Sequence, residues 1–313
     1  MPDPTAASPD SNDHGDHAAY FDAWRGGVLD TMIGMPASAE ERKTKHYAQI
    51  NAGILDKEAR EQFAFPAQYM FKDVPDYGDV IDDPVALLLA EMDRFNIGRG
   101  MINVGTNPVA QQALRDHPDR FVGSCNVDPN RGMEAVRELE IAVKELGVRS
   151  AQSFPAGFVP QVPINDKKYY PLYAKCVELD IPIFVNAGVP GPRVPMDCQH
   201  VKYIDEVCWF FPDLKFVMRH GAEPWTELAV KLILKWPNLY YSTSGFAPKH
   251  YPADVIYYAN TRGADKLIYG GYFPMGLSLE RIFTEMPNVG FRDEVWPKFL
   301  RTNAEGILGL ETT

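Results

Sequence analysis

Two polar turns near the C-terminal end of the chain each follow an apolar run that is typical of a buried strand. The first turn, in KFVMRHGAEPW, carries His220 and Glu223, and the second, in KLIYGGYFP, carries Tyr272. An imidazole has an ordinary pKa near 6.5, so His220 can take and give protons at neutral pH. A carboxylate can orient that ring, and a phenol can donate a hydrogen bond to a developing oxyanion. We therefore predict that His220, Glu223 and Tyr272 are the catalytic residues of an acid–base site.

Further side chains at the ends of other predicted strands could hold the carboxylate or carbonyl group of a substrate. We expect six of them to bind the substrate: Asp30, Met32, Gln152, Asn186, Ser242 and Ser244. Two residues from connecting segments join this set. Arg193, after NAGVPGP, could pair with an acidic substrate, and Tyr69, in an aromatic and proline-rich segment, could form a hydrophobic wall.

Each of these assignments has a structural alternative. His220 could serve only as a hydrogen-bonding partner, and Glu223 could stabilise the start of a helix through the macrodipole. Tyr272 could fill space, Asp30 could brace the first strand, and Arg193 could lie in a surface loop.

The elements that would position these residues alternate along the chain between short β-rich runs and amphipathic helical stretches. The runs occupy residues 26–34, 100–105, 121–127, 148–154, 181–188, 214–221, 239–245 and 266–272. Such alternation predicts a parallel sheet, and eight runs predict an α/β fold, a closed (β/α)₈ TIM barrel. The C-terminal ends of all eight strands then meet at one end of the barrel, where active sites of this architecture form. A doubly wound open sheet is the alternative, but no glycine fingerprint follows the first run.

The N-terminal end of the chain differs in composition from the rest. The first 20 residues are rich in Pro, Asp and Ser, so we predict a disordered tail over 1–20. Residues 21–313 form a single predicted barrel domain. The segment between the first two strands, about 35–98, is too long for a simple loop and must carry helices of its own.

Composition excludes several classes of partner. The formal net charge is -11 over 313 residues, which argues against nucleic acid or an anionic membrane surface. No apolar run approaches the roughly 18 residues of a membrane span. The four cysteines show no CxxC spacing and lie in apolar or helical stretches, which indicates buried thiols in a reduced, cytoplasmic protein. We expect a small-molecule substrate.

The motifs from the fifth predicted strand onward resemble, in order, those of the amidohydrolase-related family that includes aminocarboxymuconate-semialdehyde decarboxylase and the resorcylate-type decarboxylases. The matching segments are INDKKYYPLYAKCVELDIPIFVNAGVPGP, FVMRHGAEPW, PNLYYSTSG, GADKLIYGGYFP and RTNAEGILGL. The resemblance covers most of residues 26–310. It implies a TIM barrel, and it implies that His220 is a base and that Glu223 belongs to the His-x-x-Glu pattern of the decarboxylase-like branch.

The chain departs from this family at its metal ligands. Where the family has Asp-x-His-x-His on the first strand, this chain has Asp30, Met32 and Gly34. The family's strand-five His is Asn186, and its strand-eight Asp is Tyr272. A catalytic zinc or manganese ion needs at least three convergent donors, so we predict no bound metal and no other cofactor. A site rebuilt from His220, Glu223 and a loop residue, or a metal hydrolase with other ligands, are the alternatives.

The surviving groups favour a metal-independent lyase that acts by acid–base catalysis on a small cyclic or aromatic carboxylated compound. Hydrolysis of a lactone or similar ester is a second possibility. The competing hypothesis is a non-catalytic relative that binds a ligand or supports a metal-bearing paralogous partner subunit. The family commonly forms dimers or larger assemblies, so the resemblance also implies a homo-oligomer.

Overall fold

The computed structural model describes residues 28–31, 83–105, 107–191, 194–273 and 277–310. Its strands are β1 (Val28–Thr31), β2 (Arg99–Asn103), β3 (Phe121–Asn126), β4 (Ser150–Ser153), β5 (Ile183–Asn186), β6 (Phe216–Arg219), β7 (Leu239–Ser242) and β8 (Leu267–Ile268). Its α-helices are α5 (Pro84–Arg94), α6 (Pro108–Asp116), α7 (Met133–Leu146), α8 (Tyr170–Glu178), α9 (Lys202–Phe210), α10 (Thr226–Lys235), α11 (Ala253–Tyr258), α12 (Leu279–Glu285) and α13 (Asn303–Leu308). Each predicted strand therefore has a counterpart, which is shorter than the predicted run.

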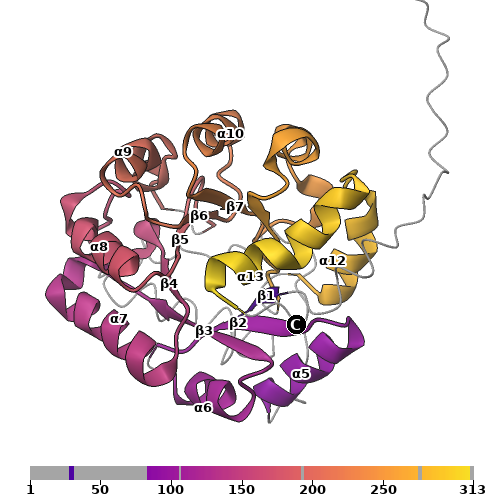
Figure 1. Cartoon of the computed structure of the whole chain (residues 1–313), viewed down its shortest axis with the longest axis horizontal. Helices are drawn as coiled ribbons and strands as arrows, with labels where there is room; N and C mark the ends of the chain where they lie inside the picture. Colours follow the sequence, from indigo (N-terminus) through magenta and orange to yellow (C-terminus); the bar gives the residue numbers. More distant parts are fainter. Residues whose placement is uncertain (1–27, 32–82, 106, 192–193, 274–276, 311–313) are drawn as a thin grey trace, which may run out of the picture.

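The strands pair in parallel in sequence order, from β1 to β8. Figure 1 looks along the barrel and shows the helices as an outer ring around the strands. This arrangement confirms the predicted TIM-barrel fold. Of the predicted insertion over 35–98, the structure describes the last part, which carries α5. The predicted tail over 1–20 lies outside the described residues.

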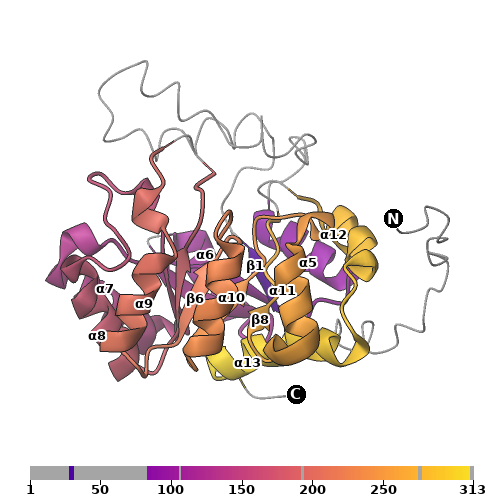
Figure 2. The ribbon, with the colours of Figure 1, turned by 90° about the horizontal axis from the view of Figure 1, so that it is seen from above.

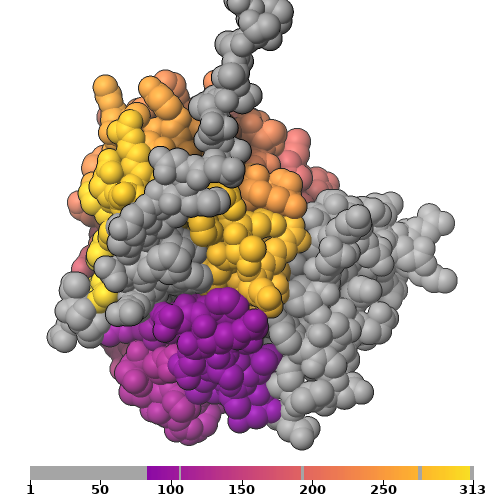
Figure 3. Space-filling view, turned by 90° about the vertical axis from the view of Figure 1, so that its right-hand side faces the viewer, coloured from indigo at the N-terminus to yellow at the C-terminus, as the bar shows by residue number. Residues whose placement is uncertain are grey.

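The ring of helices continues from the last helices to the first. Figure 3 shows α5 beside the C-terminal part of the chain. Arg94 at the end of α5 donates from Nη2 to Glu280 Oε2 of α12 over 3.1 Å. The rings of Phe95 and Phe283 stack there with centroids 5.5 Å apart. These contacts close the helical layer around β1 and β8.

Local sequence signals start two of these helices. Asp83 and Asn107 each precede a proline, and each side chain accepts hydrogen bonds from the backbone N–H groups of the second and third residues that follow it. Such N-caps satisfy donors that the helix itself cannot pair. The proline at the first helical position loses nothing, because its missing N–H has no helical partner there. In the described part of the chain, no helix has the length and apolar composition that crossing a membrane requires.

Two hydrophobic clusters stabilise the barrel. The larger lies between the strands and the outer helices. The smaller, which we call the barrel-interior cluster, fills the barrel's N-terminal end. Its residues Val122, Phe184 and Val217 are each the second residue of their strand. Helix α13 closes this end with Ile307 and Leu308, and Figure 2 shows it across the bottom of the barrel. The opposite end, formed by the strands' C-terminal ends, is where a site is expected.

The eighth strand is shorter than the predicted run over 266–272. After Ile268 the backbone leaves the ladder, because the N–H of Tyr269 donates to the carbonyl of Phe299 over 2.8 Å. Phe299 lies in the π-helical turn Lys298–Thr302 that leads into α13. Tyr272 therefore lies in the segment after β8 rather than on the strand.

Candidate active site at the C-terminal ends of the strands

His220 follows β6 directly and has an unusual backbone. Its φ is +66°, and Gly221 and Ala222 follow at +87° and +56°. Left-handed backbone is uncommon for residues other than glycine and costs about 1–2 kcal/mol. Such strain persists only where the surrounding structure fixes it, and it concentrates at functional sites. The backbone conformation thus indicates that His220 is a candidate functional residue, independently of the chemistry of its side chain.

The ring of His220 is held from two sides. Its Nδ1 lies 3.0 Å from Ser244 Oγ, and its backbone N–H donates to the same oxygen over 3.3 Å. Ser242 Oγ donates to Ser244 Oγ over 3.4 Å. The Tyr272 ring meets the imidazole edge to face, with centroids 5.5 Å apart. Four predicted site residues are therefore together, and Nδ1 is the ring nitrogen that pairs with Ser244.

The surroundings of His220 favour its neutral form. Burial, and then the positive charge of Arg219, hold the pKa of the imidazole well below its ordinary value, and a hydrogen bond with the backbone of Ser244 offsets this only in part. A buried imidazole avoids charge because the protonated form loses its hydration. His220 is therefore a neutral base at pH 7 rather than a standing cation.

Arg219 is a functional candidate that the sequence reasoning missed. Its Nη1 donates to Gln152 Oε1 over 3.1 Å, although β4 and β6 are separated by β5. Gln152 Nε2 in turn donates to Ser124 Oγ of β3 over 3.0 Å. Side chains from strands that are not neighbours meet in the barrel interior. Strand alternation could have found Arg219, because Val217 two residues earlier belongs to the interior cluster.

Asn186 lies beside Arg219, and the two are Cα partners in the β5–β6 register. Phe184, two residues earlier, belongs to the barrel-interior cluster, so Asn186 faces inward as well. The side chain is buried at 9% exposure. Its Oδ1 has no hydrogen-bond partner. Buried polar atoms without partners are rare and call for an explanation.

Among the residues that the structure describes, Glu223 forms no hydrogen bond with His220. It lies three residues before α10, which begins at Thr226, rather than at the first turn of the helix as the sequence indicated. Burial, and then the nearby carboxylate of Asp254 on α11, raise the pKa of Glu223. Its backbone carbonyl accepts a hydrogen bond from the N–H of Val189 over 2.8 Å. The structure therefore gives Glu223 a different electrostatic neighbour from the one predicted.

Three predicted binding residues, Met32, Tyr69 and Arg193, lie outside the described residues. Asp30 is placed on β1 opposite Met101 of β2 by the strand register. The predicted buried thiols are confirmed: all four cysteines are free and buried. Burial raises the pKa of the Cys176 thiol to about 12, which suppresses its reactivity.

The donors present at the strand ends do not fit a zinc or manganese ion. In the part of the chain that the structure describes, no three His, Cys, Asp or Glu side chains come together. Asn186 offers one neutral oxygen, Nδ1 of His220 is engaged with Ser244, and the guanidinium of Arg219 repels a cation. These donors lack the three anionic or imidazole ligands that such ions take in catalytic sites.

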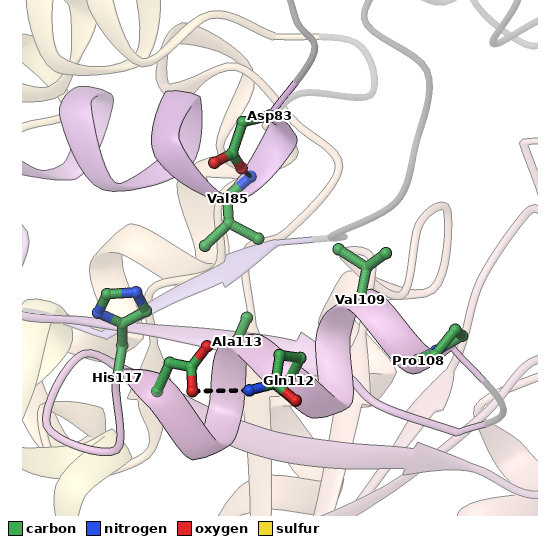
Figure 4. Close-up of a pocket in the computed structure, with 8 residues that line it drawn as sticks. Asp83, Val85, Pro108, Val109, Gln112, Ala113 and His117 are labelled. Carbon is green, nitrogen blue, oxygen red and sulfur yellow. Dashed lines mark hydrogen bonds between the residues drawn. The ribbon is translucent and has the colours of Figure 1, made fainter.

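A groove of about 410 Å³ on the outside of the barrel is a separate feature. It lies between α5 and α6, where Figure 4 shows Val85, Val109 and His117 around it and a hydrogen bond from Gln112 to Asp116. Asp83 on its rim already caps α5. The groove brings no group of the predicted site together.

Comparison with known proteins places the chain in a family. The model of the amidohydrolase family matches residues 47–310. A 2-keto-4-carboxy-3-hexenedioate hydratase from a Sphingobium species is 29% identical over 122 residues, which is 34% of this chain and 36% of that protein. The chain thus aligns with about a third of the length of the curated relative it matches.

Solved structures share the fold. An uncharacterized TIM-barrel protein from Bordetella bronchiseptica has a TM-score of 0.67 and 22% identity, over 90% of this chain and 98% of that one. A 5-carboxyvanillate decarboxylase from Novosphingobium aromaticivorans, complexed with manganese and 4-hydroxy-3-methoxy-5-nitrobenzoic acid, has a TM-score of 0.63 and 16% identity. That match covers 92% of this chain and 97% of the decarboxylase.

Proposed function

The chain belongs to the amidohydrolase family, and from this premise we propose that it is a lyase that works by acid–base catalysis without a divalent metal. Its substrate is a small cyclic or aromatic carboxylate. The observation that carries the proposal is the state of His220. The residue is held in left-handed backbone, fixed through Nδ1 by Ser244, and kept neutral by burial and by Arg219. Such a ring is prepared to take a proton through Nε2.

In a decarboxylation, His220 acts twice on a ring that carries a hydroxyl beside its carboxylate. Nε2 first removes the hydroxyl proton and then returns it to the ring carbon that bears the carboxylate. The bond from that carbon to the carboxylate breaks, its electron pair restores the aromatic ring as a phenolate, and CO₂ leaves. The phenolate recovers a proton from solvent. Tyr272, in contact with the imidazole, stabilises the oxyanion through its phenol.

Addition of water to an unsaturated keto acid is the other lyase reaction that fits this set of groups. The curated relative named above is a hydratase, although it aligns with this chain over a limited segment. In that reaction the neutral imidazole takes a proton from the attacking water, whose oxygen bonds to one carbon of the double bond, and the imidazolium then gives that proton to the other carbon. The same Nε2 atom of His220 serves both reactions, so the experiment below applies to either.

The test uses a panel of hydroxybenzoates and unsaturated keto acids as substrates, with CO₂ release and ultraviolet absorbance as readouts. On any compound that the wild type converts, His220→Gln is expected to lower turnover by roughly a hundredfold or more. His250→Gln is the matched control, because that side chain is exposed in the short helical turn Pro248–His250. It should leave turnover unchanged. Equal turnover in His220→Gln and the wild type would remove the assigned base.

The metal-free part of the proposal has its own measurement. Elemental analysis of the purified protein should give far less than one transition-metal ion per chain, and treatment with a chelator should leave turnover intact. We expect this result because the side chains at the strand ends include the neutral amide of Asn186 and the guanidinium of Arg219, which do not suit a divalent cation. A stoichiometric ion that chelation removes together with activity would overturn this part and leave the role of His220 standing.

A further inference from the structure

The end of β5 carries a polar side chain that the reaction scheme above does not use. Asn186 is the last residue of β5, and it is 9% exposed. Phe184, two positions earlier, packs in the barrel-interior cluster, so alternation along the strand directs Asn186 into the barrel as well. Within the described part of the chain, Oδ1 of Asn186 is buried and has no hydrogen-bond partner. The amide thus presents an unpaired acceptor at the end of the barrel where active sites of this architecture form.

Backbone contacts hold Asn186 beside His220. The N–H of the residue after Asn186 donates to the carbonyl of Arg219, directly before His220, over 3.0 Å. One residue further, Gly188 has a φ of +90°, and a Cβ atom there would lie 2.6 Å from the carbonyl oxygen of Glu223. Glycine therefore lets the segment after β5 pack directly on the segment after β6. The two segments carry Asn186 and His220 to neighbouring places at the same end of the barrel.

The unpaired acceptor weakens the ligand-free protein. Most buried polar atoms have a partner, and one that has none loses its hydration without compensation. An apolar side chain of similar shape at the same place would avoid this loss. The other residues of β5 are of that kind, since Ile183, Phe184 and Val185 are apolar and buried. An amide at Asn186 is therefore explained when a bound ligand supplies the missing hydrogen-bond donor.

The kind of donor follows from the chemistry of the two side chains. In the proposed decarboxylation, His220 takes the proton of the hydroxyl next to the carboxylate, so that hydrogen is not available to Asn186. The carbonyl oxygen of an amide only accepts hydrogen bonds. An ether oxygen, a halogen or an ionised carboxylate on the ligand would therefore leave Oδ1 unpaired. A second O–H or N–H group on the ring meets the requirement.

We propose that Asn186 determines specificity by accepting, at Oδ1, the hydrogen of a second donor group on the substrate ring. The substrate class is therefore a ring carboxylate with two donor groups, a hydroxyl that His220 deprotonates and another O–H or N–H that donates to Asn186. This inference rests on the proposed function, because it names the substrate class of the same site. The hydrogen bond forms only in the complex, so the amide stabilises the bound substrate and not the free protein.

The binding test uses pairs of 2-hydroxybenzoates that differ at one ring position, where one member carries a second hydroxyl and the other a fluorine. Fluorine is close to hydroxyl in size but donates no hydrogen bond. By calorimetry, wild-type protein should bind the hydroxyl member of at least one pair about tenfold or more tightly. Asn186→Leu should bind both members of that pair equally. Asn288→Leu, at an exposed position in the turn Met286–Asn288, is the matched control and should keep the wild-type preference.

Asn186→Ala covers the case in which leucine does not fit, because it removes the amide without adding volume. It should lose the preference for the hydroxyl member as Asn186→Leu does. A general loss of structure would weaken both members of the pair alike and leave the preference in place. The absence of a preference in every pair for the wild type, through equal binding or none, would overturn the assignment. So would a preference that persists in either folded Asn186 variant.

A second measurement needs no ligand. Urea unfolding of the free proteins should give a higher midpoint for Asn186→Leu or Asn186→Ala than for the wild type, because each variant removes the unpaired acceptor. Lower midpoints for both would show that the amide is already paired in the free protein, for example by a buried water, and would contradict the proposal. Failure of the proposed function is distinguishable, because unaltered turnover in His220→Gln leaves these binding and unfolding results as they are.

Discussion

At the scale of single residues, the left-handed backbone of His220 makes a prediction about stability. A φ of +66° costs alanine about 1–2 kcal/mol and glycine almost nothing. Glycine loses part of this advantage because it is more flexible in the unfolded chain, by about 0.4–1 kcal/mol. His220→Gly should therefore be more stable than His220→Ala by roughly 0.5–1 kcal/mol. Urea unfolding of the two variants measures the difference, and a more stable alanine variant would show that the strain is absent.

The pH dependence of stability follows from the same residue. The pKa of His220 is lower in the folded protein than its unfolded value near 6.5, mainly because of burial. Above pH 6.5 the imidazole is neutral in both the folded and the unfolded protein, and its contribution to the free energy of unfolding is fully present. As the pH falls below 6.5, the unfolded state takes up a proton before the folded state does, so the free energy of unfolding decreases.

His220→Gln removes that proton uptake. Its free energy of unfolding should vary less than that of the wild type between pH 6.5 and pH 5. Urea unfolding at a series of pH values measures this. An equal change of the free energy of unfolding with pH in His220→Gln and the wild type would mean that folding does not lower the pKa of the His220 ring.

Four of the residues predicted for the site lie close together in the structure. His220, Ser242, Ser244 and Tyr272 were predicted from strand ends, and the structure brings them together. Arg219 was missed although alternation along β6 places it on the same face as Val217, because the sequence alone did not show that this face points into the barrel. The expected partnership of Glu223 with His220 relied on sequence proximity, whereas the pKa of Glu223 is raised by burial and then by the charge of Asp254 on α11.

At the scale of elements, β7 and β8 position the hydrogen-bond partners of His220. Gly270 follows β8, and a Cβ atom there would lie 2.7 Å from Ser242 Oγ and 2.7 Å from Ser244 Cβ. Real Cβ atoms do not approach other atoms so closely. The glycine therefore allows the segment after β8 to pack directly on the two serines. The sequence predicted all eight strands, but it could not predict where β8 ends, because a distant segment around Phe299 takes the next hydrogen bond.

Gly270→Ala should separate these segments. We expect it to lower the free energy of unfolding by about 1–3 kcal/mol, as overpacking does, and to reduce turnover because Ser244 holds the His220 ring. Gly306→Ala is the matched control: it is an exposed position in α13 with no atom within 4 Å of the added Cβ. That variant should gain roughly 0.5–1 kcal/mol, since alanine favours helix. Urea unfolding and a turnover assay compare them, and a Gly270→Ala protein as active as Gly306→Ala would contradict the role of this packing.

At the scale of the whole molecule, the residues that stabilise the barrel and the residues of the candidate site lie at opposite ends of its axis. The N-terminal end is apolar and is closed by α13, whereas the C-terminal end carries Arg219, Asn186 and His220. In this architecture the C-terminal face hosts function and the opposite face supports the fold. A change at the closed end should therefore alter stability without altering the binding site.

Ile307 tests this separation, because it is 5% exposed on α13 and packs in the barrel-interior cluster. Ile307→Ala leaves a cavity and should lower the free energy of unfolding by about 2–5 kcal/mol. Ile141→Ala on α7 is the matched control, because that side chain is 51% exposed and should cost within about 0.5 kcal/mol. Below their unfolding temperatures both variants should turn over substrate as the wild type does. Lower turnover by folded Ile307→Ala would show that the closed end is coupled to His220 across the barrel, and that the two ends do not act independently.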